Sequence, residues 1–134
     1  MPDDNLEVVR RFLIGINDQD IGAALMDLGP GAELDWSGSD APDSGVYRGR
    51  AAWRDWMSGR SEQLTNLRFD VTELIDVPPD RVVVVARVTG RGRVSGIDTV
   101  SLGASVWMLR DRQVSRLTLY QTRGDALKAV GLEE

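Results

Sequence analysis

The strongest hydrophobic pattern in the chain runs from Asp98 to Tyr120 and predicts two long strands joined by a tight turn. Val, Leu, Trp, Met and Tyr recur on both sides of the polar segment 110–113, which is typical of strands with at least one packed face. An apolar hairpin is not stable alone in water. Helices from the earlier half of the chain are therefore expected to cover it.

Helical spacing of apolar residues characterises that earlier half. It predicts one helix over 4–17 and a second, shorter helix that starts at Asp18 or Asp20 and ends at the Gly-Pro-Gly segment 29–31. The apolar stripes of these two helices consist of Leu6, Val9, Phe12, Leu13 and Ile16, and of Ile21, Ala24, Leu25 and Leu28.

Short runs of β-branched and aromatic residues, separated by Gly, Pro and Ser clusters, predict the strands. Val82–Val85 is apolar at every position, as in a strand covered on both faces. The remaining predicted elements are strands over 32–36, 46–48, 66–77, 81–92, 97–110 and 114–121, helices over 50–64 and 123–132, and an aperiodic loop over 37–45. Early helices and late strands indicate one α+β domain over residues 1–134, with a curled, mostly antiparallel sheet around helices and a pocket at the open end.

The amino-acid composition excludes several kinds of binding and catalytic site. The 134 residues carry a net charge of −5, the wrong sign for binding nucleic acid or an anionic membrane surface. There is no Cys and no His, which excludes zinc–thiolate sites and every His-dependent triad. We expect no metal and no cofactor, so that Asp, Glu, Tyr, Arg or Lys128 would carry any acid–base step. The acidic N-terminal segment and the absence of a long apolar run lead us to expect a cytoplasmic protein.

Five segments together resemble one family: Ala32–Trp36, Ser44–Gly49, Asp80–Val84, Val106–Asp111 and Asp125–Leu132. Through them the chain resembles a SnoaL-like member of the nuclear transport factor 2-like superfamily, which includes ketosteroid isomerases and polyketide cyclases. The resemblance covers nearly the whole chain and implies a cystatin-like α+β cone with an internal pocket. It implies no single reaction, because the superfamily contains many enzymes and many non-enzymes.

The catalytic groups of ketosteroid isomerases are absent from the matching positions. In that family a Tyr and an Asp donate hydrogen bonds to the forming oxyanion while a second Asp moves the proton. The matching positions here are Phe12, Ala104 and Trp36. Ser105 stands where many SnoaL-like relatives carry a His, and Thr122 stands where many carry an Asp. Ketosteroid isomerase in its usual form is therefore rejected.

Asp35 and Asp98 remain as candidate catalytic residues. Asp35 lies between Leu34 and Trp36 in a predicted strand, and Asp98 starts a long apolar strand. A carboxyl group that faces an apolar cone has its pKa raised by desolvation and can act as a base near neutral pH. The alternative is that each carboxylate faces solvent or pairs with an arginine.

Aromatic residues of the first half are predicted to line the pocket and to bind a flat, apolar ligand. An ordinary packed core is the alternative, above all for the two tryptophans of the helix over 50–64. The residues expected to contact the ligand are Phe12, Ile16, Trp36, Tyr47, Trp53, Trp56, Met57 and Ala104.

The opposite face of the 98–120 hairpin is predicted to form a dimer interface. If alternation holds around Ala104, Trp107 and Tyr120 point outward, and exposed aromatic residues on a sheet face require a partner. The superfamily commonly dimerises through this face. We expect a symmetric homodimer with Ser105, Trp107, Thr118 and Tyr120 in the interface.

Three functional hypotheses follow from the sequence. The first is a protein that binds a small hydrophobic molecule, with cofactor-free isomerase, cyclase or hydratase chemistry if it is an enzyme. The second is a ligand-binding module without activity, and the third is a structural dimer whose cavity is filled by its own side chains. An inward Asp35 with a raised pKa would favour the enzyme.

Overall fold

The computed structural model describes residues 2–38 and 44–132. The order of helices and strands along the chain is much as the periodicity predicts. The elements are α1 (Pro2–Asn17), α2 (Ile21–Ala24), a 3₁₀ turn η1 (Leu25–Asp27), β1 (Leu28–Asp35), β2 (Val46–Arg48), α3 (Arg50–Gln63), β3 (Leu64–Val77), β4 (Arg81–Gly92), β5 (Asp98–Arg110), β6 (Gln113–Tyr120) and α4 (Arg123–Ala129).

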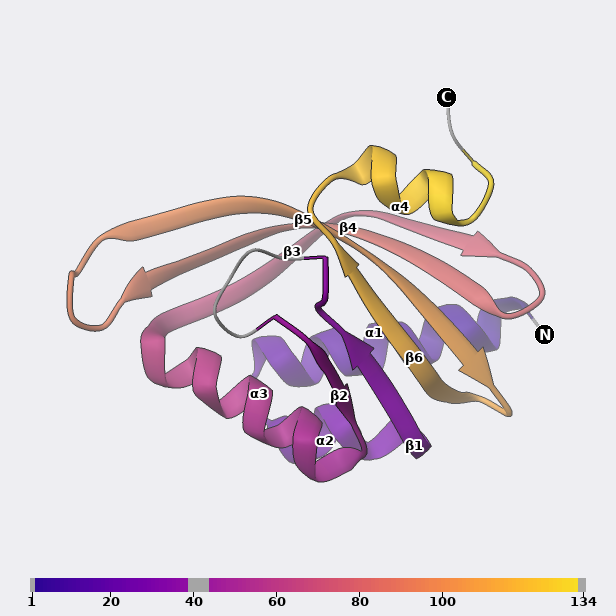
Figure 1. Ribbon diagram of the computed structural model, residues 1–134, viewed down its shortest axis with the longest axis horizontal. Coiled ribbons are helices and arrows are strands. Elements are labelled where there is room, and N and C mark those ends of the chain that lie inside the picture. The colour runs from indigo at the N-terminus through magenta and orange to yellow at the C-terminus, as the bar shows by residue number, and fades with distance from the viewer. Residues whose placement is uncertain (1, 39–43, 133–134) are drawn as a thin grey trace.

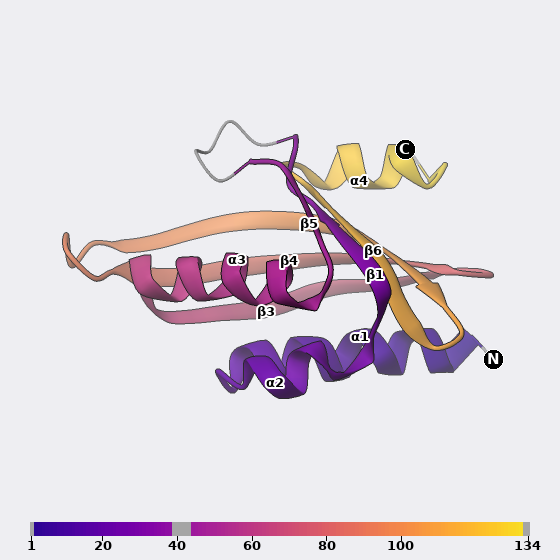
Figure 2. The same cartoon turned by 60° about the horizontal axis from the view of Figure 1, so that its bottom comes forward.

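The strands form one sheet in the order β2-β1-β6-β5-β4-β3. Only β1 and β6 pair in parallel; the other neighbouring strands described here are antiparallel. Figures 1 and 2 show α1 and α2 on one side of the sheet and α4 on the other. We call the side that packs against α1 and α3 the inner face, and the side that packs against α4 the outer face. This arrangement confirms the predicted α+β class with a mostly antiparallel, curved sheet.

Both faces of β4 are covered. Val82 and Val84 pack in the inner cluster with α1, whereas Val83 and Val85 pack in the outer cluster with Ala126 and Leu127 of α4. All four valines are at most 5% exposed. The prediction that Val82–Val85 is a strand buried on both sides is therefore confirmed.

Segment 29–31 does not end the second helix, and that prediction is wrong. The helix stops at Ala24 and η1 at Asp27, after which Leu28 already pairs with Val114 of β6. A Cβ on Gly29 would lie 3.3 Å from the carbonyl oxygen of Val114, so the absence of a side chain there lets β1 approach β6 closely. The Gly-Pro-Gly segment thus forms an irregular stretch of a strand.

Two contacts place the first helices over the inner face. At Gly15 any Cβ would lie 2.7 Å from the backbone nitrogen of Ala24, so glycine allows α1 and α2 to touch. The Asn17 side chain donates to the carbonyl of Phe69 at 2.9 Å and accepts from its N–H at 2.8 Å. Asn17 therefore fixes the end of α1 against β3.

Candidate functional site

A cavity of about 710 Å³ lies between α1, α3 and the inner face of the sheet. Its wall is built from the apolar stripe of α1, the middle of α3, the start of β3 and the inward residues of β4 to β6. The main apolar residues of this wall are Phe12, Leu13, Ile16, Trp36, Trp56, Met57, Phe69, Val84, Ala86, Trp107, Leu117 and Leu119.

Most of the residues predicted to bind a ligand border this cavity. Phe12, Ile16, Trp36, Trp56, Met57 and Ala104 are in its wall. Trp53 and Tyr47 are not. Trp53 is completely buried, where its ring packs edge-to-face on Phe12 and its Nε1–H donates to the carbonyl of Ala32 at 2.9 Å. Tyr47 packs against Trp56 with 6.3 Å between ring centroids. Trp53 is therefore a residue of the packed core, which was the alternative to a pocket-lining residue.

The orientation predicted for β5 is reversed. Ala104 and Val106 pack in the outer cluster under α4, whereas Trp107 packs in the inner cluster with Phe12. Ser105 and Trp107 are only 8% and 2% exposed. They belong to the cavity wall and cannot form the predicted dimer interface, because the protomer itself already covers them. Ala104 reaches the cavity where the pairing of β5 with β6 ends, opposite Tyr120.

Thr118 lies on the outer face, and Tyr120 packs on that face while it also borders the cavity at the end of β6. Leu117 and Leu119 of β6 line the cavity, so the residues that alternate with them point to the other side. Tyr120 is half-buried and packs against the outer cluster, and Thr118 is also half-buried.

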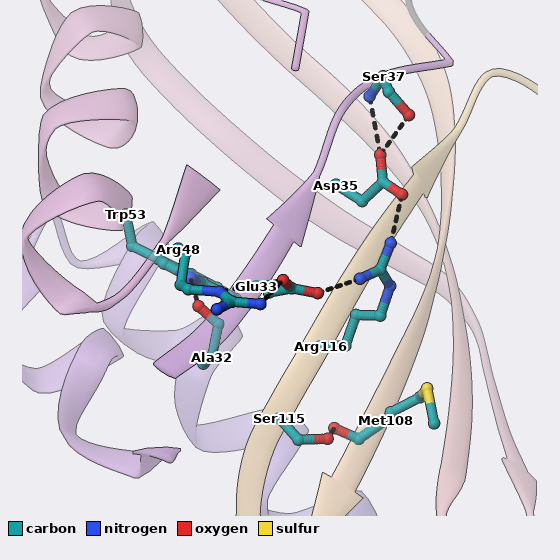
Figure 3. A network of polar contacts seen from close by, with 9 residues as sticks. All are labelled: Ala32, Glu33, Asp35, Ser37, Arg48, Trp53, Met108, Ser115 and Arg116. Carbon is teal, nitrogen blue, oxygen red and sulfur yellow. Dashed lines mark hydrogen bonds and ion pairs between the residues drawn. The ribbon is translucent and has the colours of Figure 1, made fainter. Parts of the chain in front are cut away.

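Asp35 points away from the cavity. In β1, Ala32 and Leu34 are buried in the inner cluster, and Glu33 and Asp35 alternate with them on the outer face. Figure 3 shows the Arg116 guanidinium between these two carboxylates, with Nη2 donating to Oδ2 of Asp35 at 2.6 Å. Arg116 also donates to Glu33, which accepts a further hydrogen bond from Arg48.

The electrostatics of Asp35 are those of an ion pair and not of a base. Burial by itself raises the pKa of Asp35, but hydrogen bonds from the hydroxyl and N–H of Ser37 and the charge of Arg116 outweigh it. The net effect lowers the pKa below its ordinary value of 3.8. The prediction of an inward Asp35 acting as a base is therefore wrong. The alternation of side chains along β1 points this carboxylate to the outer face, where it pairs with Arg116 of β6.

Asp98 is wrong as a catalytic candidate for a similar reason. Its side chain is 70% exposed and its Oδ1 accepts from Nε of Arg91 at 2.7 Å. The hydrogen bond and the charge of Arg91 lower the pKa of Asp98. Asp98 is not among the residues of the cavity wall.

None of the polar residues of the wall was predicted from the sequence to line the pocket. None of the described wall residues is an Asp or a Glu. Gln19 and Asn66 adopt left-handed φ angles of 58° and 56°. Asn adopts the left-handed conformation more readily than Gln does, so the residue type indicated this conformation for Asn66 but not for Gln19. The polar wall residues are Gln19, Thr65, Asn66, Arg93, Ser101, Ser105, Tyr120 and Gln121.

The described part of the chain contains neither a cluster of metal ligands nor a membrane-spanning helix. No three His, Cys, Asp or Glu side chains there gather as metal ligands would. Among its helices, none is long and apolar enough to cross a membrane.

Comparisons with known proteins add the family and the fold. A family model described as SnoaL-like domain matches residues 9–117. No curated protein matches the chain. One similar solved structure is a protein of ketosteroid isomerase-like fold from Catenulispora acidiphila in complex with trimethylamine, with 14% identity, 94% of this chain and 93% of that chain covered, and a TM-score of 0.76. TerC co-crystallised with polyporic acid has 20% identity, 96% and 98% of the two chains covered, and a TM-score of 0.78. Bal32a from a soil-derived mobile gene cassette has 17% identity, 88% of each chain covered, and a TM-score of 0.79. At these identities the likeness shows the fold, and it confirms the predicted α+β cone.

Proposed function

The chain belongs to the SnoaL-like domain family, and from that premise we propose that it binds a small, flat, hydrophobic molecule in the cavity beneath its sheet. The observation that carries this proposal is the cavity itself. Its volume of about 710 Å³ falls in the range of sites that enclose small molecules, and its wall is mostly aromatic and aliphatic. Two proteins of the same fold have been crystallised with small molecules, trimethylamine and polyporic acid, which supports the proposal.

Binding without acid–base catalysis by Asp35 or Asp98 is the version of this function that we favour. Both carboxylates pair with arginines outside the cavity wall, and each has a lowered pKa. A carboxyl group with a lowered pKa is a weak base and holds no proton to donate near neutral pH.

A thermal-shift screen with steroids, polycyclic aromatic ketones and terpenoid ketones tests the proposal. A compound at 100 times its Kd stabilises the folded state by about 2.7 kcal/mol, a shift of several degrees in Tm. Ala86→Leu should abolish the shift, because Ala86 lies in the wall and the larger side chain would occupy the cavity. Ala129→Leu is the matched control, since Ala129 is exposed on α4 and the same change there should leave binding intact.

Two results would contradict the proposal. One is a folded wild-type protein that no compound class stabilises. The other is a stabilisation that Ala86→Leu and Ala129→Leu retain equally, since the ligand would then lie elsewhere.

The partner on the outer face is proposed to be a second copy of the chain. Alternation from Ala104 places Val100 on that face, where it is 60% exposed and lies beyond the half-buried Tyr120. Leu102, which is 68% exposed, alternates to the same face and also borders the cavity. Such exposed apolar side chains on a sheet face favour association. The interface would comprise Thr118 and Tyr120 with these two residues, in place of Ser105 and Trp107.

A further inference from the structure

Ser105 is the one polar side chain that the described residues bury, at 8% exposure. It lies on the inner face of β5 between Val84 of β4 and Leu119 of β6, and all three residues belong to the cavity wall. A hydroxyl group in an apolar wall is costly unless its hydrogen-bonding capacity is used. The hydrogen bonds of Ser105 therefore indicate what the wall can offer a ligand.

The indole of Trp107 fixes the Ser105 hydroxyl. Trp107 Nε1 donates to Ser105 Oγ at 2.9 Å, and the indole is held in turn by an edge-to-face contact with Phe12, with ring centroids 4.8 Å apart. The Ser105 oxygen is thus an acceptor in this pair. A hydroxyl also has one proton to donate, and the described residues provide no acceptor for it. Accepting from the indole polarises the O–H bond and makes the hydroxyl a better donor.

We propose that Ser105 anchors a ligand of this cavity by donating its O–H proton to a carbonyl oxygen. The ligand class is a flat, apolar ring ketone, because the wall around Ser105 is apolar and the hydroxyl supplies a single directed donor. Trp107 is a positioning residue, since it orients the donor without itself meeting the carbonyl. This inference rests on the proposed ligand-binding function.

The probes that test the anchor are 9-fluorenone and fluorene, two rigid tricyclic molecules that differ only by a carbonyl in place of a methylene. Ser105→Ala should weaken the binding of fluorenone about fivefold, the usual value of one net hydrogen bond. The Kd of fluorene should change by less than about twofold, because fluorene has no acceptor to lose. Fluorene thereby controls for any change in cavity shape when Trp107 loses its acceptor.

Ser105→Thr retains the hydroxyl and should restore the affinity for fluorenone. The carbonyl stretching band of bound fluorenone gives a second readout, which a merely structural role would not move. It should lie at lower frequency in wild type and Ser105→Thr than in Ser105→Ala.

Equal losses for fluorenone and fluorene, or a carbonyl band that Ser105→Ala leaves unchanged, would overturn the anchor and leave the proposed function standing. Failure of both probes to bind the wild-type protein would overturn the anchor with its flat ring ketone. If no compound class of the thermal-shift screen binds either, the proposed function is overturned with it.

Discussion

At the scale of single residues, the Asp35 carboxylate holds two strands together instead of acting as a base in the cavity. The Asp35 side chain is 15% exposed and that of Arg116 is 33% exposed, and their ion pair joins the parallel strands β1 and β6. Partly buried, charge-assisted hydrogen bonds of this kind contribute more to stability than pairs in open solvent.

We expect Asp35→Asn to lower the free energy of unfolding by about 1 kcal/mol at neutral pH, measured by urea denaturation, with ligand binding unchanged. Asp70→Asn is the matched control, because the Asp70–Arg68 pair has side chains 52% and 61% exposed. Its effect should stay below about 0.5 kcal/mol. Similar losses for the two variants would show that Asp35 has no special structural role.

The same pair predicts a pH dependence. Since folding lowers the pKa of Asp35, its contribution to stability is complete above the ordinary value of 3.8 and is lost as the pH falls through the lower pKa of the folded state. Wild type should therefore lose more stability than Asp35→Asn between neutral pH and about pH 2. Parallel curves would contradict the ion-pair interpretation.

At the scale of elements, α4 depends on the outer face of the sheet. A helix of seven residues is not stable alone. Thr122 caps it by accepting from the N–H of Asp125, and Arg123 pairs with Glu73 of β3 at 2.6 Å. Its largest buried contribution is Leu127, which packs on the outer valines of β4.

We expect Leu127→Ala to cost about 2–4 kcal/mol of unfolding free energy, because Leu127 is only 4% exposed and its removal leaves a cavity in the outer cluster. Leu132→Ala, at a residue that is 43% exposed, should cost less than about 0.5 kcal/mol. Chemical denaturation measures both. A Leu127→Ala variant as stable as Leu132→Ala would mean that α4 is not docked on the sheet.

At the scale of the whole molecule, the two faces of the sheet are covered unequally. The inner face carries α1, α2 and α3, whereas α4 covers only part of the outer face (Figures 1 and 2). The outer residues Val100 and Leu102 stay exposed in the described protomer. This asymmetry supports the proposed homodimer.

Val100→Asp should convert the proposed dimer to a monomer, because it would place a charge in an apolar interface. Val94→Asp, in the connection between β4 and β5, should leave the dimer intact. Light scattering after gel filtration at micromolar concentration gives the masses. A monomeric wild type, or a dimer that survives Val100→Asp, would exclude this interface.

Much of the cavity could be predicted from sequence alone. The stripe of α1 places Phe12 and Ile16 in the wall, and the aromatic residues Trp36 and Trp56 join them as expected. The outward direction of Asp35 was also readable, since Ala32 and Leu34 alternate with Glu33 and Asp35.

By itself the sequence determined the periodicities, and with them the helices, the strands, the α+β class and the family. These follow from local spacing, because buried positions recur every 3.6 residues in a helix and every second residue in a strand. Only the tertiary structure decided which alternating set of β5 faces the cavity. Both sets carry residues that can be buried, so the orientation of β5 depends on the helix that packs against each face. Trp107 and Ser105 lie on the side of α1, and Ala104 and Val106 lie on the side of α4.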